Sequence, residues 1–240
     1  FASKGMVPVY CDIREDTLNI DESKIEKLIT EKTKAIVPIH YAGIPAEMDK
    51  INEIAKRYNI PVIEDAAQAV NSMYKGKYAG SLCELGIYSF HATKSYSSGE
   101  GGALTINNAH YFERSEYLWE KGTDRSLVVK GIKNKYSWVD FGSSFLPSDI
   151  LSALLYSQFE NIDKLQEKRK NLHDAYMKVF SKLKKFGLRI LFVPDKIEPN
   201  YHAFWLLFNN ENQRDNFISL SLAKGISPYI GYMPLHSSPM

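Results

Sequence analysis

Three residues in the first half of the chain carry side chains that could serve one site: Asp65, Ser89 and Lys94. Asp65 directly follows the apolar segment "IPVIE", and Ser89 lies near the end of the apolar segment "LGIYSF". Lys94 lies five residues further on, in a loop rich in serine and glycine. A lysine amine can form a Schiff base with a carbonyl cofactor, a carboxylate can hold a protonated ring nitrogen, and a hydroxyl can bind a phosphate. Together these groups predict a site for pyridoxal 5'-phosphate, with Lys94 carrying the cofactor.

Each of these residues also has a simpler interpretation when it is taken alone. Asp65 could cap a helix or form a surface salt bridge, and a single loop lysine is usually solvated. The glycines of "GEGGAL" do not have the spacing of a dinucleotide-binding fingerprint or of a Walker A loop, so the loop favours neither NAD nor a P-loop phosphate.

The elements that must position these residues alternate between short apolar segments and amphipathic ones. The sequence predicts strands over 7–13, 35–40, 60–67, 85–90, 101–106, 203–208 and 226–230, and helices over 21–29, 46–58, 148–185 and 212–225. The long helical region should break or bend near Asn161, and Gly225 should end the last helix. The strands are uniformly apolar, as expected for a parallel sheet with helices on both faces. This order predicts an α/β fold built on a βαβαβ unit, in which Asp65, Ser89 and His40 follow strands at the edge where open parallel sheets bind ligands.

Composition limits the classes of protein. The 240 residues are 44% hydrophobic and 12% aromatic, which is enough for a substantial core, and the formal net charge of +2 does not favour nucleic acid as a partner. No apolar run approaches the roughly 20 residues that span a bilayer. Cys11 and Cys83 form no disulfide framework and have no metal-ligand spacing, so we expect no metal and a cytoplasmic location.

Several motifs resemble those of one known family. The segments "VPIHYAG", "VIEDAAQA", "YSFHATKSYSSGEGGAL" and "PLHSSP" occur in this order, and they resemble the DegT/DnrJ/EryC1/StrS sugar-nucleotide aminotransferases over essentially the whole chain. The resemblance implies the type I PLP-dependent aminotransferase fold, with a mostly parallel central sheet flanked by helices and a smaller C-terminal α/β domain. We expect the large domain over 1–160, without its N-terminal part, and an incomplete smaller domain over 161–240.

The resemblance also implies roles for individual residues. Lys94 matches the family's Schiff-base lysine, Asp65 its partner for the pyridine nitrogen, Gln68 a residue near the phenolic oxygen, and Ser89 a phosphate ligand. His236 and Tyr41 match positions near the substrate. Many relatives have an asparagine that reaches the neighbouring subunit's cofactor phosphate and an arginine two positions later; here these positions are Ser144 and Leu146. Serine still donates a hydrogen bond with shorter reach, whereas leucine cannot replace a guanidinium.

Within the family, "HYAGIPAEMDKI", "KGTDRS", "GSSFLPSDI" and "YMPLHSSP" look most like the dTDP-4-amino-4,6-dideoxygalactose transaminase branch, which serves enterobacterial common antigen and related surface glycans. The resemblance implies a homodimer that shares its active sites and transfers an amino group from L-glutamate to a dTDP-4-keto-6-deoxy sugar. Alternatives are a 3-keto-sugar or gluco-epimer-forming aminotransferase, a dehydratase, against which Lys94 argues, a non-catalytic sugar-nucleotide binding or scaffold protein, and a Rossmann dehydrogenase.

Overall fold

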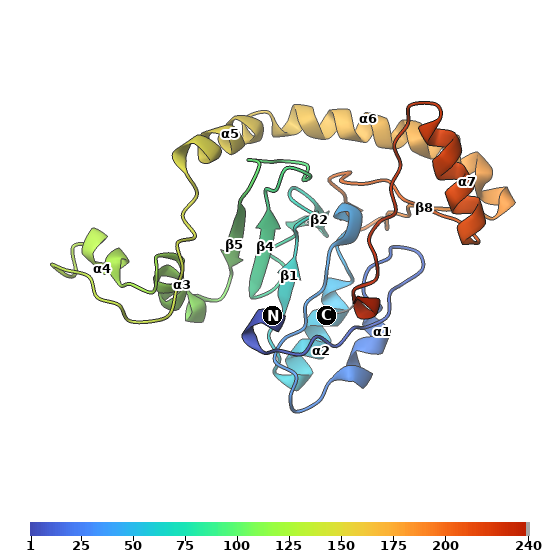
Figure 1. The fold of residues 1–240 in the computed structure, drawn as a ribbon. Coiled ribbons are helices and arrows are strands. Elements are labelled where there is room, and N and C mark those ends of the chain that lie inside the picture. Colours follow the sequence, from blue (N-terminus) through green and yellow to red (C-terminus); the bar gives the residue numbers. More distant parts are fainter. Residues whose placement is uncertain (239–240) are drawn as a thin grey trace.

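The central sheet of the computed structural model, which describes residues 1–238, lies in the middle of the molecule (Figure 1). Its strands are β1 (Ile63–Asp65), β4 (Leu85–Ser89) and β5 (Gly102–Ile106), in the order β1-β4-β5. β1 and β4 are parallel, and β4 and β5 are antiparallel. Parallel bridges at Ile36 and Ile39 place the predicted strand 35–40 beside β1, on the side away from β4. These bridges are isolated and do not extend into a continuous ladder. The second half of the predicted βαβαβ unit, from residue 35 onward, is therefore confirmed.

Helix α2 (Met48–Tyr58) joins segment 35–40 to β1 and shows why this region folds as predicted. Its buried residues, Met48, Ile51, Ile54 and Ala55, recur at intervals of three, three and one and so form one apolar face. This face packs into the main hydrophobic core. The helix ends at Asn59, whose left-handed φ of 52° lets its N–H bond back to the last turn.

After β5 the chain forms α3 (Phe112–Trp119) and α4 (Arg125–Val129), which lie in an arm beside the sheet (Figure 1). The chain then returns as α5 (Asp149–Phe159) and α6 (Ile162–Phe180). The side chain of Ser148 caps α5 by accepting a hydrogen bond from the N–H of Leu151. The break between α5 and α6 confirms the bend predicted near Asn161.

The remaining elements are short, and several of them join distant parts of the chain. They are α1 (Glu22–Ile25), β2 (Met73–Tyr74), β3 (Lys77–Tyr78), β6 (Arg189–Ile190), β7 (Ile197–Glu198), β8 (Leu206–Leu207) and α7 (Glu211–Leu222). β7 adds to the β2–β3 hairpin, so the C-terminal third of the chain is attached beside the loop that follows β1. Gly225 has a φ of 77° after α7, as predicted for the end of that helix.

Two predicted strands are wrong. Residues 7–13 form only an isolated bridge at Ile13, and residues 226–230 form no strand. Both segments are apolar but exposed: Val7 is 85% and Tyr229 is 77% accessible. Apolar composition alone does not make a strand without a neighbour to pair with. The expectation that helices cover both faces of every strand is also wrong for β5, where Leu104 is 52% accessible.

No helix among residues 1–238 is long and apolar enough to cross a lipid bilayer. Within the same range, no cluster of three or more histidine, cysteine, aspartate and glutamate side chains is arranged to hold a metal ion.

Candidate functional site

Asp65 and Ser89 lie at the same edge of the sheet because β1 and β4 are adjacent and parallel. Asp65 is paired in register with Ile87, so Ser89 is two residues beyond it on the next strand. One oxygen of Asp65, Oδ1, accepts the N–H of Ala67 at 3.1 Å. Within the described part of the chain no side chain pairs with its other oxygen, which leaves one acceptor for a ligand.

The residue before Asp65 fixes the end of β1 from the interior. Glu64 is fully buried, and its carboxylate accepts hydrogen bonds from His40 Nε2 at 2.9 Å and from the backbone N–H groups of Gly80, Leu82 and Cys83 at 2.6, 2.6 and 3.0 Å. Burial alone would raise the pKa of Glu64, but the hydrogen bonds, led by that from His40, outweigh it and lower the pKa. Glu64 is thus a buried carboxylate whose charge is satisfied by four donors.

The tautomer of His40 follows from its second nitrogen. Nδ1 of His40 lies 3.2 Å from the backbone N–H of Ala46 and must accept that hydrogen bond, so the proton of a neutral ring lies on Nε2 and is donated to Glu64. His40 was expected to follow a strand at the ligand edge. The structure places it there, with its N–H bonded to the carbonyl of Asp65, but its ring is completely buried and both ring nitrogens are engaged, so it supports Glu64.

Gln68 holds two loops together beside Asp65. Its Oε1 accepts the N–H of Ala42 at 2.7 Å, and its Nε2 donates to the hydroxyl of Tyr232 at 3.3 Å. Tyr232 is 164 residues away in sequence, so the C-terminal segment lies against the loop after β1. Tyr41 lies near the same segment: burial raises the pKa of its phenol, and the neighbouring Tyr232 and Tyr229 add to the effect.

Lys94 lies in a tightly wound loop between β4 and β5. The N–H of Lys94 donates to the carbonyl of His91 at 2.9 Å, and that of Ala92 donates to the carbonyl of Gly99 at 2.8 Å. At Gly101 the φ is 138°, and a Cβ there would lie 3.0 Å from the hydroxyl of Ser98, so glycine is required. The loop is therefore ordered by its own hydrogen bonds.

Tyr96 anchors the Lys94 loop to the long helices. It is completely buried, its hydroxyl donates to Gln166 Oε1 at 3.0 Å, and its ring lies 5.9 Å from that of Phe159. The N–H of Ser97 donates to Gln158 at 3.0 Å. The fully solvated loop lysine considered above is therefore not what the structure shows: Lys94 is half-buried on an anchored loop.

His202 lies beside Lys94 and was not recognised from the sequence. Its Nδ1 is 2.8 Å from the hydroxyl of Ser95. Burial, followed by the positive charges of Lys94 and Arg169, lowers the pKa of His202 to about 4. The only signal in the sequence was a lone histidine before a predicted strand, and its partner Ser95 is 107 residues away.

The lowered pKa of His202 predicts a loss of stability in acid. Between the ordinary histidine pKa of about 6.5 and the folded value of about 4, the unfolded chain takes up a proton that the folded chain does not. Between pH 7 and pH 4, the free energy of unfolding of the unmodified protein should therefore fall by about 3 kcal/mol more than that of His202→Asn, which has no titrating group at this position. Urea denaturation across this range measures the difference. An equal fall in both proteins would contradict the prediction.

Two predicted residues lie apart from this group. Ser144 is exposed and bridges to Glu120 in the arm that carries α3 and α4, away from the sheet edge (Figure 1). His236 is exposed on the C-terminal segment, where its ring lies 6.3 Å from that of Tyr10. Ser89 is half-buried at the end of β4, and within residues 1–238 its hydroxyl accepts only a long 3.4 Å contact from the N–H of His91.

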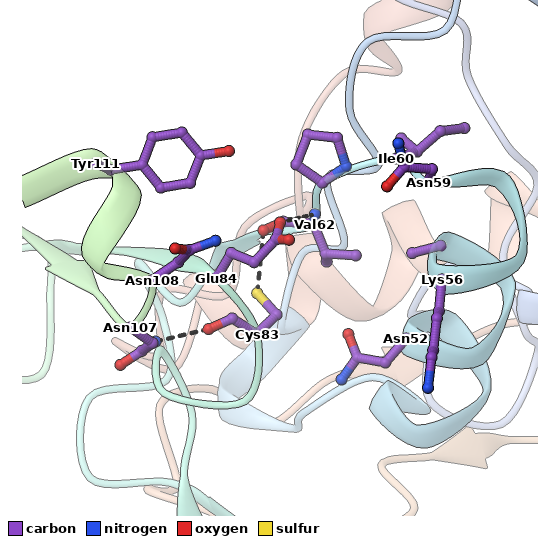
Figure 2. Close-up of a pocket in the computed structure, with 12 residues that line it drawn as sticks. Asn52, Lys56, Asn59, Ile60, Val62, Cys83, Glu84, Asn107, Asn108 and Tyr111 are labelled. Carbon is purple, nitrogen blue, oxygen red and sulfur yellow. Dashed lines mark hydrogen bonds between the residues drawn. The ribbon is translucent and has the colours of Figure 1, made fainter.

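A separate cavity of about 560 Å³ opens at the opposite end of the strands (Figure 2). It is lined by Val62 and Cys83 together with asparagines such as Asn107, which donates to the carbonyl of Cys83 at 2.7 Å. Burial, followed by the charge of Glu64, raises the pKa of the Cys83 thiol to about 12. Cys83 is therefore a thiol at neutral pH, and none of the predicted site residues lines this cavity.

The high pKa of Cys83 predicts poor thiol reactivity. Because the thiolate is the reactive form, Cys83 in the folded protein should react with a thiol-specific disulfide reagent at least about 10²-fold more slowly than in urea. Absorbance during the reaction, with a Cys11→Ser variant to isolate the signal, gives the rate. Comparable rates in folded and unfolded protein would contradict the burial of Cys83.

A sequence model of the DegT/DnrJ/EryC1/StrS aminotransferase family matches residues 2–240. Curated relatives include an uncharacterized protein of Methanocaldococcus jannaschii, 34% identical over 100% of this chain and 65% of its own length. They also include a GDP-perosamine synthase of Caulobacter vibrioides, 32% identical over 98% of this chain and 62% of its own. A third is the UDP-4-amino-4,6-dideoxy-N-acetyl-beta-L-altrosamine transaminase of Campylobacter jejuni, 33% identical over 95% and 60%. The chain thus spans under two thirds of the length of these relatives.

Solved aminotransferase structures have the same fold. The aminotransferase TlmJ from Streptoalloteichus hindustanus superposes with a TM-score of 0.89 at 26% identity, over 99% of this chain and 63% of that one. The sugar aminotransferase Spr1654 from Streptococcus pneumoniae in its PLP form gives 0.85 at 26%, over 98% and 63%. The predicted type I aminotransferase fold is confirmed, and the chain belongs to the DegT/DnrJ/EryC1/StrS aminotransferase family.

Proposed function

We propose that the protein is a PLP-dependent sugar-nucleotide aminotransferase that moves an amino group from L-glutamate to C4 of a dTDP-4-keto-6-deoxy-hexose. The products are 2-oxoglutarate and a dTDP-4-amino-4,6-dideoxy sugar, for which we propose the galacto configuration and a use in surface polysaccharide biosynthesis such as enterobacterial common antigen. The observation that carries this proposal is the placement of Asp65, Gln68, Ser89 and the Lys94 loop around one edge of the sheet.

The residues present suit pyridoxal phosphate. One carboxylate oxygen of Asp65 accepts the N–H of Ala67, and the other has no side-chain partner in residues 1–238. This second oxygen can accept a hydrogen bond from the protonated nitrogen of a pyridine ring. Among the described residues no carboxylate forms an ion pair with Lys94; Glu100, the acidic residue of the same loop, lies 3.7 Å from His91. The hydroxyl of Ser89 makes only a long contact and can donate to a phosphate. The arrangement offers an acid and a hydroxyl at the ends of two adjacent strands, and an amine in the loop that follows the second of these strands.

When bound, pyridoxal phosphate supplies an electron sink for the charge that develops on the donor's α-carbon. Asp65 would accept the pyridinium N–H and stabilise its positive charge. Lys94 would hold the cofactor through its amine and, once displaced by the donor amine, would carry the proton between the donor's α-carbon and C4' of the cofactor. Ser89 would donate to the phosphate, and Gln68 would lie near the phenolic oxygen.

We further propose that the sugar lies toward Tyr41 and His236. Tyr41 is half-buried, and its raised pKa keeps the phenol protonated as a hydrogen-bond donor near neutral pH. The nucleotide is the least constrained part of the substrate: the relatives named above carry GDP and UDP in their names, whereas motif resemblance favours dTDP. The 3-keto-sugar and gluco-epimer alternatives would use the same four cofactor residues.

We propose that two subunits pair through the arm that carries Ser144. Large apolar side chains on this arm are highly exposed, including Val129 at 77%, Trp138 at 73%, Phe141 at 96% and Phe145 at 64%. Large exposed apolar side chains that recur within one segment of the chain favour a protein contact there. Such pairing would let Ser144 donate to the partner's cofactor phosphate. We also propose that the chain divides into a large domain over 1–160 and a smaller one over 161–240.

Replacing Asp65 with asparagine tests the role of its charge. An amide of the same shape can hydrogen-bond but cannot hold the ring nitrogen protonated, so amino transfer should slow by about 10²- to 10⁴-fold. Pyridoxal phosphate should still bind, which separates this effect from loss of the site. Rates measured by coupled 2-oxoglutarate detection give the answer, and an Asp65→Asn rate within a factor of two would contradict the assignment.

The proposed reaction is tested with purified protein, pyridoxal phosphate, L-glutamate and 4-keto-6-deoxyhexoses linked to dTDP, GDP and UDP. We expect 2-oxoglutarate and an amino sugar in equal amounts with the dTDP substrate, and proton NMR couplings at C4 should give the galacto epimer. Preference for GDP or UDP would correct the nucleotide, a gluco product would correct the epimer, and no product with any substrate would overturn the function.

A further inference from the structure

We infer that the turn Asn200–Tyr201–His202 is a positioning element of this site, which ties the loop carrying Asp65 and Gln68 to the loop carrying Lys94. The inference rests on the proposed function for its meaning, since it assigns His202 as a positioning residue for the cofactor lysine. The contacts that support the role of this turn are buried, join three segments distant in sequence, and are independent of the proposed function.

Asn200 is the anchor of this turn. It is fully buried, and its Nδ2 donates to the carbonyls of Gln68 at 2.9 Å and Val70 at 2.8 Å. Its N–H donates to the hydroxyl of Ser72 at 3.0 Å, and its Oδ1 accepts the N–H of His202 at 3.0 Å. A buried amide with all of these groups paired fixes the turn against the loop that follows β1.

The loop between segment 35–40 and α2 is built around the same asparagine. A Cβ at Gly43 would lie 1.9 Å from Oδ1 of Asn200, and Gly43 has a left-handed φ of 84°. Only glycine therefore allows this close approach. The carbonyl of Gly43 also accepts the hydroxyl of Ser72 at 2.7 Å, so the two loops and the turn form one packed unit.

Tyr201, between the anchor and the histidine, has a strained backbone. Its φ of 56° is in the left-handed region, which a residue with a bulky side chain rarely adopts. Its ring packs 5.0 Å from that of His173 on α6, which holds it in place. Such strain persists where the surroundings over-determine it and is concentrated at functional sites. Here its effect is to aim His202 toward Ser95.

His202 completes the connection to the Lys94 loop. Its Nδ1 lies 2.8 Å from the hydroxyl of Ser95, the residue next to Lys94. The charged groups that face His202 are Lys94 itself and Arg169 on α6. Because burial and these two cations keep the pKa of His202 far below neutrality, the imidazole can hold Ser95 without adding a positive charge beside the lysine.

The first test follows His202 by NMR in cofactor-free protein. Imidazole resonances assigned with His202→Asn should titrate near pH 4, and the midpoint should rise in Lys94→Met and in Arg169→Gln because each removes a nearby positive charge. Lys77→Met, on the exposed strand β3, is the matched control and should leave the midpoint unchanged. A midpoint that does not respond to Lys94→Met would overturn the inference. Because no cofactor is present, this result does not depend on whether the protein transfers amino groups.

The second test measures binding of pyridoxal phosphate by its absorbance change. His202→Leu fills the space but loses the hydrogen bond, and should weaken binding by about 5- to 10-fold. His202→Asn can return a polar atom to the position of Nδ1, and should restore binding to within about 3-fold. A merely structural histidine predicts the reverse order, because leucine suits a buried space better than asparagine. Equal binding by His202→Leu and the unmodified protein, with both folded by circular dichroism, would overturn the inference.

Discussion

Replacing Lys94 with alanine should lower the rate of amino transfer by at least about 10³-fold, because one change removes both the covalent attachment of the cofactor and the base that moves the proton. The fold should survive, since the loop is held by the backbone hydrogen bonds of His91 and Ala92 and by the buried Tyr96, not by the lysine side chain. Steady-state rates at saturating glutamate and keto sugar provide the measurement.

The matched control for this change is Lys77→Ala. Lys77 is exposed on β3 and lies on a different sheet from the site, so the rate should stay within a factor of two. Circular dichroism and thermal unfolding establish that both variants are folded. Turnover by folded Lys94→Ala comparable to that of Lys77→Ala would remove Lys94 from the reaction.

Replacing Glu64 with alanine should lower the free energy of unfolding by about 3–5 kcal/mol. The change leaves four donors without their acceptor: the buried Nε2–H of His40 and N–H of Gly80, and the partly buried N–H groups of Leu82 and Cys83. Glu64→Gln should recover only part of the lost stability, because its amide nitrogen is itself a donor and cannot accept hydrogen bonds from these four groups. Urea denaturation with a fixed slope gives the values.

Glu53→Ala controls for the loss of a glutamate as such. Glu53 is exposed on α2, where removal of a solvated carboxylate changes stability by less than about 0.5 kcal/mol. A loss below about 1 kcal/mol in Glu64→Ala would show that the buried network does not hold the end of β1. In that case the position of the neighbouring Asp65 would need another explanation.

The sequence predicted the parts of the fold that depend on periodicity. The apolar face of α2 and the bend near Asn161 follow from residue spacing, and both are present. Strand β1 is present after α2, and segment 35–40 before it pairs with β1 only through isolated bridges. Residues 7–13 and 226–230 were mistaken for strands because their composition is apolar. In the structure both are exposed, and a strand needs a partner that composition cannot identify.

The same distinction applies to the candidate site. Adjacent parallel strands bring Asp65 and Ser89 to one edge, so a rule about sheet edges was enough to place them together. The contacts of His202 with Ser95 and of Tyr232 with Gln68 join residues 107 and 164 apart in sequence. No local pattern marks such pairs, because they depend on how the C-terminal third packs against the loops after β1 and β4.

The most direct test of the central claim is to add pyridoxal phosphate to the purified protein, reduce it with borohydride and map the labelled peptide. The account predicts a visible absorption band before reduction and, afterwards, a single stable adduct on Lys94 within the peptide "SFHATKSYSSGEGGAL". The adduct should be absent in Lys94→Ala and present in Lys77→Ala. Labelling of another lysine, or no labelling by folded protein, would contradict the assignment of Lys94 as the residue that carries the cofactor.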